Sequence, residues 1–239
     1  MSTDQELRIA ICDDEPACRG RIVEMTRQIL TKSNISGGII ELCRGSALLD
    51  AMHSGIQFHI LLLDVMMPEQ DGMELAAVLR RQRQTIPIIF ISSNREMALR
   101  GYEVSAVRFL AKPVEAEKLE EALLHCYRIW LEKREILLPT EQGQYRISFS
   151  DIEYAEAFER GTRFLVDGEA VLTKLKFSEV QTLLPQPPFL LCHRAYMVNS
   201  ACIKRIRATA FELRSGAVIP ISKHRYSEVS RRFSDYITA

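Results

Sequence analysis

Apolar runs alternate with amphipathic segments through the first half of the chain, and this alternation predicts repeated strand–helix units. Near-continuous apolar runs of about four to eight residues are typical of parallel strands that are covered on both faces. Such runs lie at 7–12, 39–43, 58–63, 87–91 and 107–111. Apolar residues recur at helical spacing from Pro16, at 46–52, 73–83 and 95–102, and from Pro113 to about Arg134. We therefore predict an α/β fold with a doubly wound, five-stranded parallel sheet.

A different pattern begins near Glu135, where turn signals become frequent and the apolar runs become shorter. Strand-like runs lie at 145–149, 164–166, 170–173, 196–198 and 217–221. Helical periodicity is restricted to about 177–184 and to the segment after Ser222. These two helices are about 40 residues apart, which excludes a helix-turn-helix. We predict a second, mostly β domain at 135–239, after a first domain at 7–130.

The formal net charge is zero, but the charged residues are distributed unevenly. Residues 1–134 contain 17 Lys and Arg against 19 Asp and Glu, whereas residues 185–239 contain nine basic residues against three acidic ones. An acidic first half and a basic C-terminal segment favour different partners. Nucleic acid is the leading candidate for the basic segment.

Nothing in the sequence predicts insertion into a membrane. The N-terminal residues are polar and no cleavable apolar segment follows them. The most apolar stretch, at 60–67, is short and is interrupted by Asp64. The six cysteines have no CxxC or other chelating spacing, and Cys12 and Cys126 occupy predicted core positions, which is typical of reduced thiols in a cytosolic protein. We expect a cytoplasmic protein without a membrane partner.

Polar residues suited to phosphoryl chemistry follow several of the predicted strands. They are Asp13 and Asp14, Asp64, Ser92, and Lys112. The carboxyl ends of parallel strands meet at one edge of a sheet, so these side chains are expected to converge there. A single Asp after a strand is often only a helix cap. The combination of carboxylates, a hydroxyl and an ammonium instead predicts a phosphate site assisted by Mg²⁺.

Four motifs carry a family resemblance. They are Cys12-Asp-Asp-Glu-Pro16, Leu63-Asp-Val-Met-Met-Pro68 with Asp71-Gly72, Ile91-Ser-Ser93, and Phe109-Leu-Ala-Lys-Pro113. With these motifs in this order, the first half of the chain resembles the receiver domain of two-component response regulators. The resemblance implies that a sensor histidine kinase donates a phosphoryl group to the chain, and that the phosphorylated protein forms a homodimer.

The same resemblance implies a role for each site residue. Asp64 is the expected phosphoacceptor, and Lys112 and Ser92 are expected to contact the phosphoryl oxygens. The Mg²⁺ ligands implied are Asp13, Asp14, Asp64 and the backbone carbonyl of Met66. Ser92 and Phe109 are the expected switch residues, at positions where the family frequently has Thr and Tyr. A cis peptide bond is expected between Lys112 and Pro113.

The second half of the chain resembles the LytTR DNA-binding domain. The motifs are Asp151-Ile-Glu-Tyr154, Gly161-Thr-Arg163, Phe189-Leu-Leu-Cys-His-Arg-Ala-Tyr-Met-Val-Asn199 and Ile221-Ser-Lys-His-Arg225. The family places loops, rather than a recognition helix, in the major groove of double-stranded DNA. The residues expected at the DNA are Thr162, Arg163, His193, Arg194, Asn199, Lys223, His224 and Arg225. Leu191 and Ala195 stand where the family frequently has Arg and Ser.

These observations predict a transcriptional regulator that is switched by phosphorylation of Asp64 and binds promoter direct repeats. An alternative is a signalling module whose second domain binds protein or RNA. An enzyme is the third hypothesis, but phosphotransfer here modifies only the chain itself, and no substrate-pocket signature occurs. A metal site at Cys192-His193 is disfavoured, because adjacent strand residues point to opposite faces.

Overall fold

The computed structural model describes residues 6–68, 71–94 and 104–238. The chain divides between Trp130 and Leu131 into two compact units, and each unit has its own architecture. All six cysteines lie in the described residues and are free, and Cys12 and Cys126 are buried as expected. None of the helices in the described part of the chain is long and apolar enough to cross a membrane.

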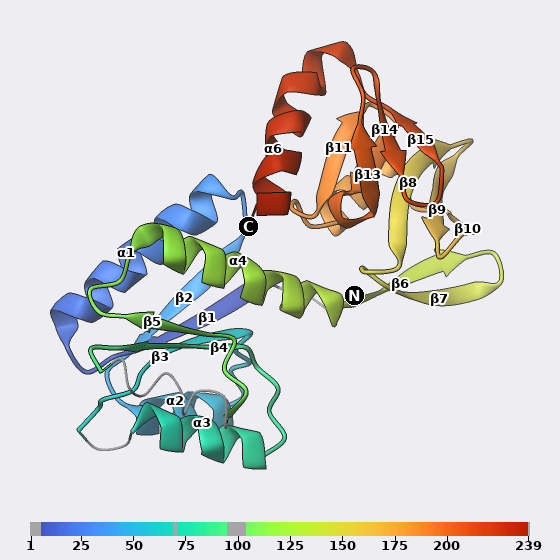
Figure 1. The fold of residues 1–239 in the computed structure, drawn as a ribbon. Helices are drawn as coiled ribbons and strands as arrows, with labels where there is room; N and C mark the ends of the chain where they lie inside the picture. Colours follow the sequence, from blue (N-terminus) through green and yellow to red (C-terminus); the bar gives the residue numbers. More distant parts are fainter. Residues whose placement is uncertain (1–5, 69–70, 95–103, 239) are drawn as a thin grey trace. The chain divides into compact units, whose positions relative to one another are not determined.

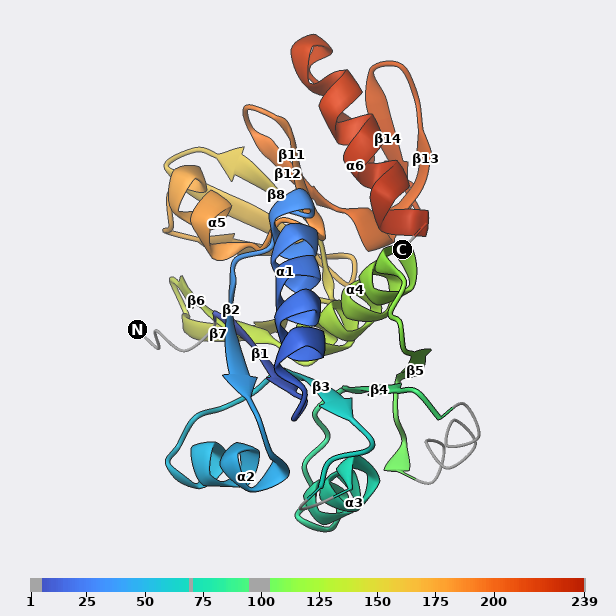
Figure 2. The same ribbon diagram turned by 90° about the vertical axis from the view of Figure 1, so that its left-hand side faces the viewer.

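The described residues of the first unit form a doubly wound α/β fold around a five-stranded parallel sheet. Its strands have the order β2-β1-β3-β4-β5 and helices cover both faces, which confirms the predicted fold class (Figures 1 and 2). The strands are β1 (Leu7–Cys12), β2 (Gly37–Leu42), β3 (Ile60–Asp64), β4 (Ile88–Ser92) and β5 (Arg108–Ala111). The helices are α1 (Pro16–Lys32), α2 (Gly45–His53), α3 (Gly72–Arg81) and α4 (Ala116–Glu132). The helix predicted at 95–102 lies outside the described residues.

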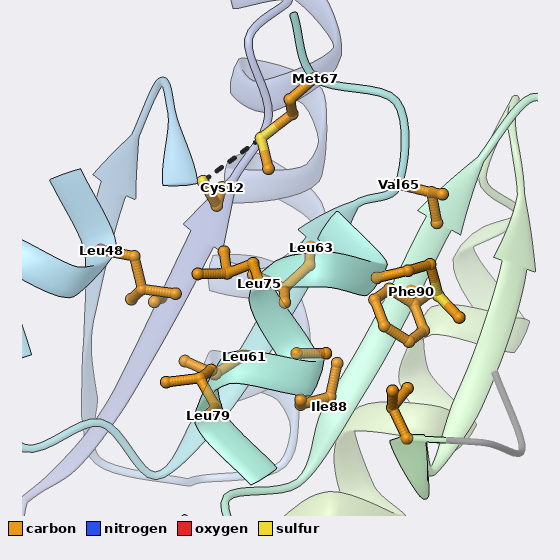
Figure 3. Close-up of a cluster of buried hydrophobic side chains, with 14 of the residues drawn as sticks. Cys12, Leu48, Leu61, Leu63, Val65, Met67, Leu75, Leu79, Ile88 and Phe90 are labelled. Carbon is orange, nitrogen blue, oxygen red and sulfur yellow. Dashed lines mark hydrogen bonds between the residues drawn. The ribbon is translucent and has the colours of Figure 1, made fainter. Parts of the chain in front are cut away.

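The central strand β3 is buried along its whole length, as its continuous apolar sequence requires. Leu61 and Leu63 belong to the cluster drawn in Figure 3, together with Leu75 and Leu79 of α3. The α1 and α4 helices cover the opposite face of the sheet (Figure 1). Complete burial of each leucine side chain contributes about 1.5–3 kcal/mol to the stability of the fold. This packing holds β3 in place, and with it Asp64 at the end of the strand.

The described part of the second unit is mostly β, as predicted. An antiparallel sheet has the order β10-β9-β8-β12-β11, and β13-β14-β15 and β6-β7 form smaller sheets. The strands are β6 (Glu135–Thr140), β7 (Gly143–Ser148), β8 (Ile152–Phe158), β9 (Gly161–Val166), β10 (Glu169–Thr173), β11 (Phe189–His193), β12 (Tyr196–Asn199), β13 (Ile203–Ile206), β14 (Ala210–Leu213) and β15 (Val218–Pro220). The helices are α5 (Phe177–Leu183) and α6 (Tyr226–Thr238), with short 3-10 turns at Ser200–Cys202 and Lys223–Arg225.

One core of this unit joins the larger sheet, the three-stranded sheet and α6. Leu190 and Val198 of the larger sheet pack there with Phe211, Ile219 and Val229. The strand-like runs predicted from the sequence did not include β8, β11, β13 or β14. The strands β13 and β14 have only four residues each, and β13 exposes two basic residues between its apolar ends, so no apolar run marks β13. Pairing with one another and packing on the larger sheet stabilise these short strands instead.

Candidate functional site

The carboxyl edge of the parallel sheet brings together side chains from four strand ends. Asp64 is the last residue of β3, Ser92 is the last residue of β4, and Asp13 and Lys112 directly follow β1 and β5. Asp13, Asp64 and Ser92 are buried, with exposed fractions of 1%, 5% and 0%. The structure therefore places the polar residues that follow the predicted strands at one edge.

Lys112 bridges the two buried aspartates. Its Nζ lies 2.6 Å from Asp64 Oδ2 and 2.8 Å from Asp13 Oδ2. Burial opposes the charged ammonium, but the interactions with Asp13 and Asp64 outweigh it, so the pKa of Lys112 is raised. Burial raises the pKa of Asp64, against the hydrogen bonds from Lys112 and from the Met66 N–H. The ammonium thus compensates part of the negative charge at this edge. The Lys112–Pro113 peptide bond is cis, as expected.

Backbone hydrogen bonds orient the same two carboxylates. Asp64 Oδ1 accepts a hydrogen bond from the Met66 N–H at 3.0 Å, and Asp13 Oδ1 accepts one from the Glu15 N–H at 2.9 Å. In addition, Arg19 Nη1 donates to the Asp13 carbonyl at 2.7 Å. Each carboxylate therefore has one oxygen held by the backbone and one oxygen beside the ammonium.

Asp71 and Gly72 support the site from the start of α3. The Asp71 side chain accepts a hydrogen bond from the Met73 N–H at 2.7 Å and caps the helix. A Cβ at position 72 would lie 2.1 Å from the Asp64 carbonyl oxygen, so only glycine fits there. These contacts explain why the Asp-Gly pair occurs in the motif, a role that the sequence alone did not specify.

The acidic residues fit a hard divalent cation. Asp13, Asp14 and Asp64 each offer a carboxylate oxygen, and these oxygens lie within 4.8 Å of one another. Three carboxylates and one ammonium carry an excess of negative charge, which a Mg²⁺ ion would neutralise. Asp14 is half-buried, so an ion can reach the cluster from solvent. Met66 is 59% exposed, and the ligand role of its carbonyl stays a prediction.

The two expected switch residues lie on adjacent strands. Ser92 Oγ accepts a hydrogen bond from the Asn94 N–H at 3.2 Å, and the Ser92 carbonyl accepts one from the Lys112 N–H at 2.9 Å. Phe109 is half-buried and packs against the buried cluster of the receiver unit. Phe90 of that cluster is labelled in Figure 3. The switch role of both residues stays a prediction.

Three loops of the second unit meet at one end of the larger sheet. The Ala157 N–H, near the end of β8, donates to the Ala195 carbonyl in the β11–β12 turn at 2.9 Å. The Ser222 N–H, before α6, donates to the Cys192 carbonyl at 2.9 Å. The β8–β9 turn, the β11–β12 turn and the 222–225 segment therefore form one edge, which we call the three-loop edge.

The three-loop edge carries several of the predicted DNA-contacting residues. Arg194, Lys223 and His224 are exposed there. Arg225 is half-buried, and its Nη1 donates to the Leu191 carbonyl at 3.4 Å. His193 is half-buried, and its Nδ1 accepts a hydrogen bond from the Ala195 N–H at 3.2 Å.

Two of the predicted DNA contacts need correction, because their side chains are buried inside the unit. Thr162 is 1% exposed and donates to the Leu175 carbonyl at 2.9 Å. Asn199 is 2% exposed, donates to the Ile152 carbonyl at 2.9 Å and accepts from the Ala201 N–H at 3.0 Å. Both side chains satisfy backbone groups, so they support the fold and are not accessible to DNA in this structure.

An exposed cation that is absent from the predicted set lies on the same edge. Arg160 is exposed in the β8–β9 turn, on the three-loop edge that also carries Arg194. In the sequence, the Arg160-Gly161 pair marks only a turn, although a cation at a hairpin tip is suited to phosphate. Elsewhere, Lys204 and Arg207 form ion pairs with Glu212, and Arg207 lowers the pKa of that carboxyl. Part of the basic charge of the C-terminal segment is therefore already compensated.

Comparisons with known proteins agree with both halves of this description. Residues 9–124 match the response regulator receiver domain, and residues 142–234 match the LytTr DNA-binding domain. The chain belongs to the response regulators that join a receiver domain to a LytTR DNA-binding domain.

Relatives of similar length match most of the chain. It is 26% identical over 238 residues to the transcriptional regulatory protein BtsR of Salmonella typhi, and the match covers 91% of this chain and 95% of that protein. It is 23% identical over 241 residues to the sensory transduction protein LytT of Bacillus subtilis, with coverage of 94% and 98%.

Solved structures are similar to each part of the chain separately. A LytTr DNA-binding domain of a putative methyl-accepting/DNA response regulator from Bacillus cereus is 28% identical, with a TM-score of 0.38. The match covers 42% of this chain and 96% of that domain's chain. The chemotaxis response regulator CheY4 of Vibrio cholerae is 22% identical, with a TM-score of 0.44. The match covers 51% of this chain and 99% of the CheY4 chain.

Proposed function

We propose that this response regulator accepts a phosphoryl group on Asp64 from a phosphohistidine of a sensor histidine kinase and then regulates transcription by binding DNA. The observation that carries the first step is the buried Asp64 carboxylate, which lies 2.6 Å from the Lys112 ammonium and beside Asp13. The two proposed partners, the phosphohistidine of the kinase and DNA, imply a cytoplasmic protein. The transfer modifies the chain itself, so we propose no separate substrate.

In the transfer, a carboxylate oxygen of Asp64 attacks the phosphorus atom. The bond between phosphorus and the histidine nitrogen breaks, and the nitrogen keeps the electron pair. Lys112 supplies positive charge to the phosphoryl oxygens, and the Ser92 hydroxyl donates a hydrogen bond to one of them. A Mg²⁺ ion held by Asp13, Asp14 and Asp64 would supply further charge stabilisation. The Met66 N–H orients the carboxylate before the attack.

Labelling with acetyl phosphate tests the phosphoacceptor. Asp64→Asn should abolish acid-stable phosphorylation of the chain, because the amide cannot act as the nucleophile. Asp50→Asn is the matched control, since Asp50 is an exposed acid on α2 of the same unit. Full labelling of the Asp64 variant, with unchanged circular dichroism, would refute the assignment.

The three-loop edge supports the second step. Arg160, Arg194 and Lys223 present exposed cations on three neighbouring loops, and each is expected to meet phosphate or a base edge. Arg194 is the proposed base reader, because a guanidinium can donate to guanine O6 and N7 together. His224 and His193 lie beside these cations on the same loops.

DNA selection with the full chain tests this step. The phosphorylated wild-type protein should enrich a shared sequence from a random double-stranded DNA library. Arg160→Ala or Lys223→Ala should each reduce the steepness of log K against log salt by about one. Enrichment of RNA in a parallel selection, or of no nucleic acid at all, would replace this proposal with an RNA-binding or protein-binding module.

A further inference from the structure

A buried acid lies next to the three-loop edge. Glu156 is in β8 and is only 6% exposed, although a negative charge beside a proposed DNA surface opposes binding. In the sheet it stands opposite Arg163 of β9 on one side and Tyr196 of β12 on the other. Since a buried unpaired carboxylate is strongly unfavourable, its partners decide what it does.

Glu156 has a partner on each neighbouring strand. Arg163 contacts Glu156 Oε1 through both Nε and Nη2, and its guanidinium lies over the Phe158 ring at 4.5 Å from the centroid. Tyr196 stands opposite Glu156 on β12, and interaction with the Glu156 carboxylate, together with burial, raises the pKa of the Tyr196 phenol. The Tyr196 ring also packs near His193, with the ring centroids 5.7 Å apart. The Glu156 carboxylate in β8 therefore lies between Arg163 of β9, which it contacts directly, and Tyr196 of β12, which stands opposite it.

These contacts lie at the base of the two turns that carry Arg160 and Arg194. Arg163 follows the β8–β9 turn in β9, and Tyr196 begins β12 directly after the β11–β12 turn. A backbone hydrogen bond from β8 to the Ala195 carbonyl joins the same two turns. A change in the Glu156 contacts would therefore shift one arginine-bearing turn relative to the other.

We propose that Glu156 is a positioning residue that holds Arg163 away from DNA and, through Arg163 and Tyr196, fixes the spacing between Arg160 and Arg194. The inference rests on the proposed DNA binding and replaces the expectation that Arg163 reads a base. Desolvation offsets much of the Coulomb attraction in a buried ion pair, so such pairs add little net stability. The geometry points to a role in selectivity for DNA sequence instead.

Arg163→Met and Glu156→Gln in the full chain test the proposal. The probes are a double-stranded fragment enriched by the wild-type protein and a fragment of random sequence. Arg163→Met should weaken binding to the enriched fragment about tenfold or more, leave random DNA nearly unchanged and leave the salt slope unchanged. Glu156→Gln releases the guanidinium, so it should strengthen binding to random DNA and steepen the salt slope by about one. Arg207→Met, which breaks an exposed pair with Glu212, is the matched control and should preserve the preference for the enriched fragment.

Two results with DNA would overturn the proposal. Equal losses on both fragments, with a salt slope reduced by about one, would show that Arg163 itself contacts phosphate. An unchanged preference for the enriched fragment in both variants would show that the pair does not position the loops. Arg163→Lys keeps the charge but loses the two-nitrogen contact, so partial recovery of the preference is expected from it.

Hydrogen exchange supplies a measurement that does not depend on DNA. Both Arg163→Met and Glu156→Gln should accelerate amide exchange in the 158–162 and 193–197 segments, while the 9–12 and 60–64 strands stay protected. Acceleration confined to 158–162 would contradict a coupling between the two turns. If the wild-type protein bound no DNA but exchange rose in both segments, the proposed function would fail while the positional coupling stood.

Discussion

Replacement of Lys112 by methionine should destabilise the receiver domain because it leaves two buried carboxylates without their cationic partner. The ammonium lies 2.6 Å from Asp64 Oδ2 and 2.8 Å from Asp13 Oδ2, and counted for the side chains alone Asp64 is 6% and Asp13 is 2% exposed. Removing one partner of a buried ion pair costs about 3–5 kcal/mol. The Lys112 side chain is itself 15% exposed, so we expect the lower end, about 3 kcal/mol, in the absence of divalent cations.

Mg²⁺ should return part of this loss. The ion and the ammonium act on the same carboxylates, so the ion should stabilise the variant more than it stabilises the wild-type protein. At a Mg²⁺ concentration of about 100 times the dissociation constant, binding adds about 2.7 kcal/mol to the folded state. The gain of the wild-type protein should be smaller, because its binding constant is reduced by the ammonium already present.

Urea unfolding followed by tryptophan fluorescence measures both effects. Trp130 is the sole tryptophan of the chain, and its ring centroid lies 4.9 Å from that of His59 and 5.6 Å from that of Tyr127. Its emission therefore reports on the receiver unit. Lys118→Met is the control, since Lys118 forms an exposed pair with Glu115 and its loss should cost less than about 1 kcal/mol. A loss below about 1 kcal/mol for Lys112→Met, or equal stabilisation of both proteins by Mg²⁺, would refute the reasoning.

Three further predictions concern packing, base recognition and assembly. Gly72→Ala should destabilise the receiver unit by about 1–3 kcal/mol, measured by urea unfolding, because the new Cβ meets the Asp64 carbonyl; an unchanged midpoint would contradict this. Arg194→Ala should weaken specific DNA binding by about 1–3 kcal/mol and relax the preference at one base pair, whereas equal losses on target and random DNA would indicate a backbone contact. Phosphorylated protein should bind two direct repeats in phase, at whole turns of about 10–10.5 bp. Inserting about 5 bp should remove the gain from phosphorylation but spare single-site binding, and an unchanged gain would exclude pairing of receivers.

The parallel sheet and the residues at its carboxyl edge follow from the local pattern of apolar and polar residues. Continuous apolar runs specify strands covered on both faces, and the residue after such a run must emerge at the sheet edge. Asp13, Asp64, Ser92 and Lys112 were therefore identifiable before their contacts were known. The sequence could not show that Lys112 bridges both aspartates, since that contact joins residues about 50 and about 100 positions apart in the chain.

In the second unit, the pairing of the strands and the exposure of the polar side chains depend on contacts between residues that are far apart in the chain. Its short strands expose one face each, so their pairing depends on partners that no local pattern names. Thr162 and Asn199 have the chemistry of DNA contacts, but the sheet buries them against backbone groups. Arg163 forms an ion pair with Glu156. Arg160 is exposed, although the sequence marks it only as part of a turn. Residue type limits what a side chain can bind, whereas burial and neighbouring charge decide whether it is free to do so.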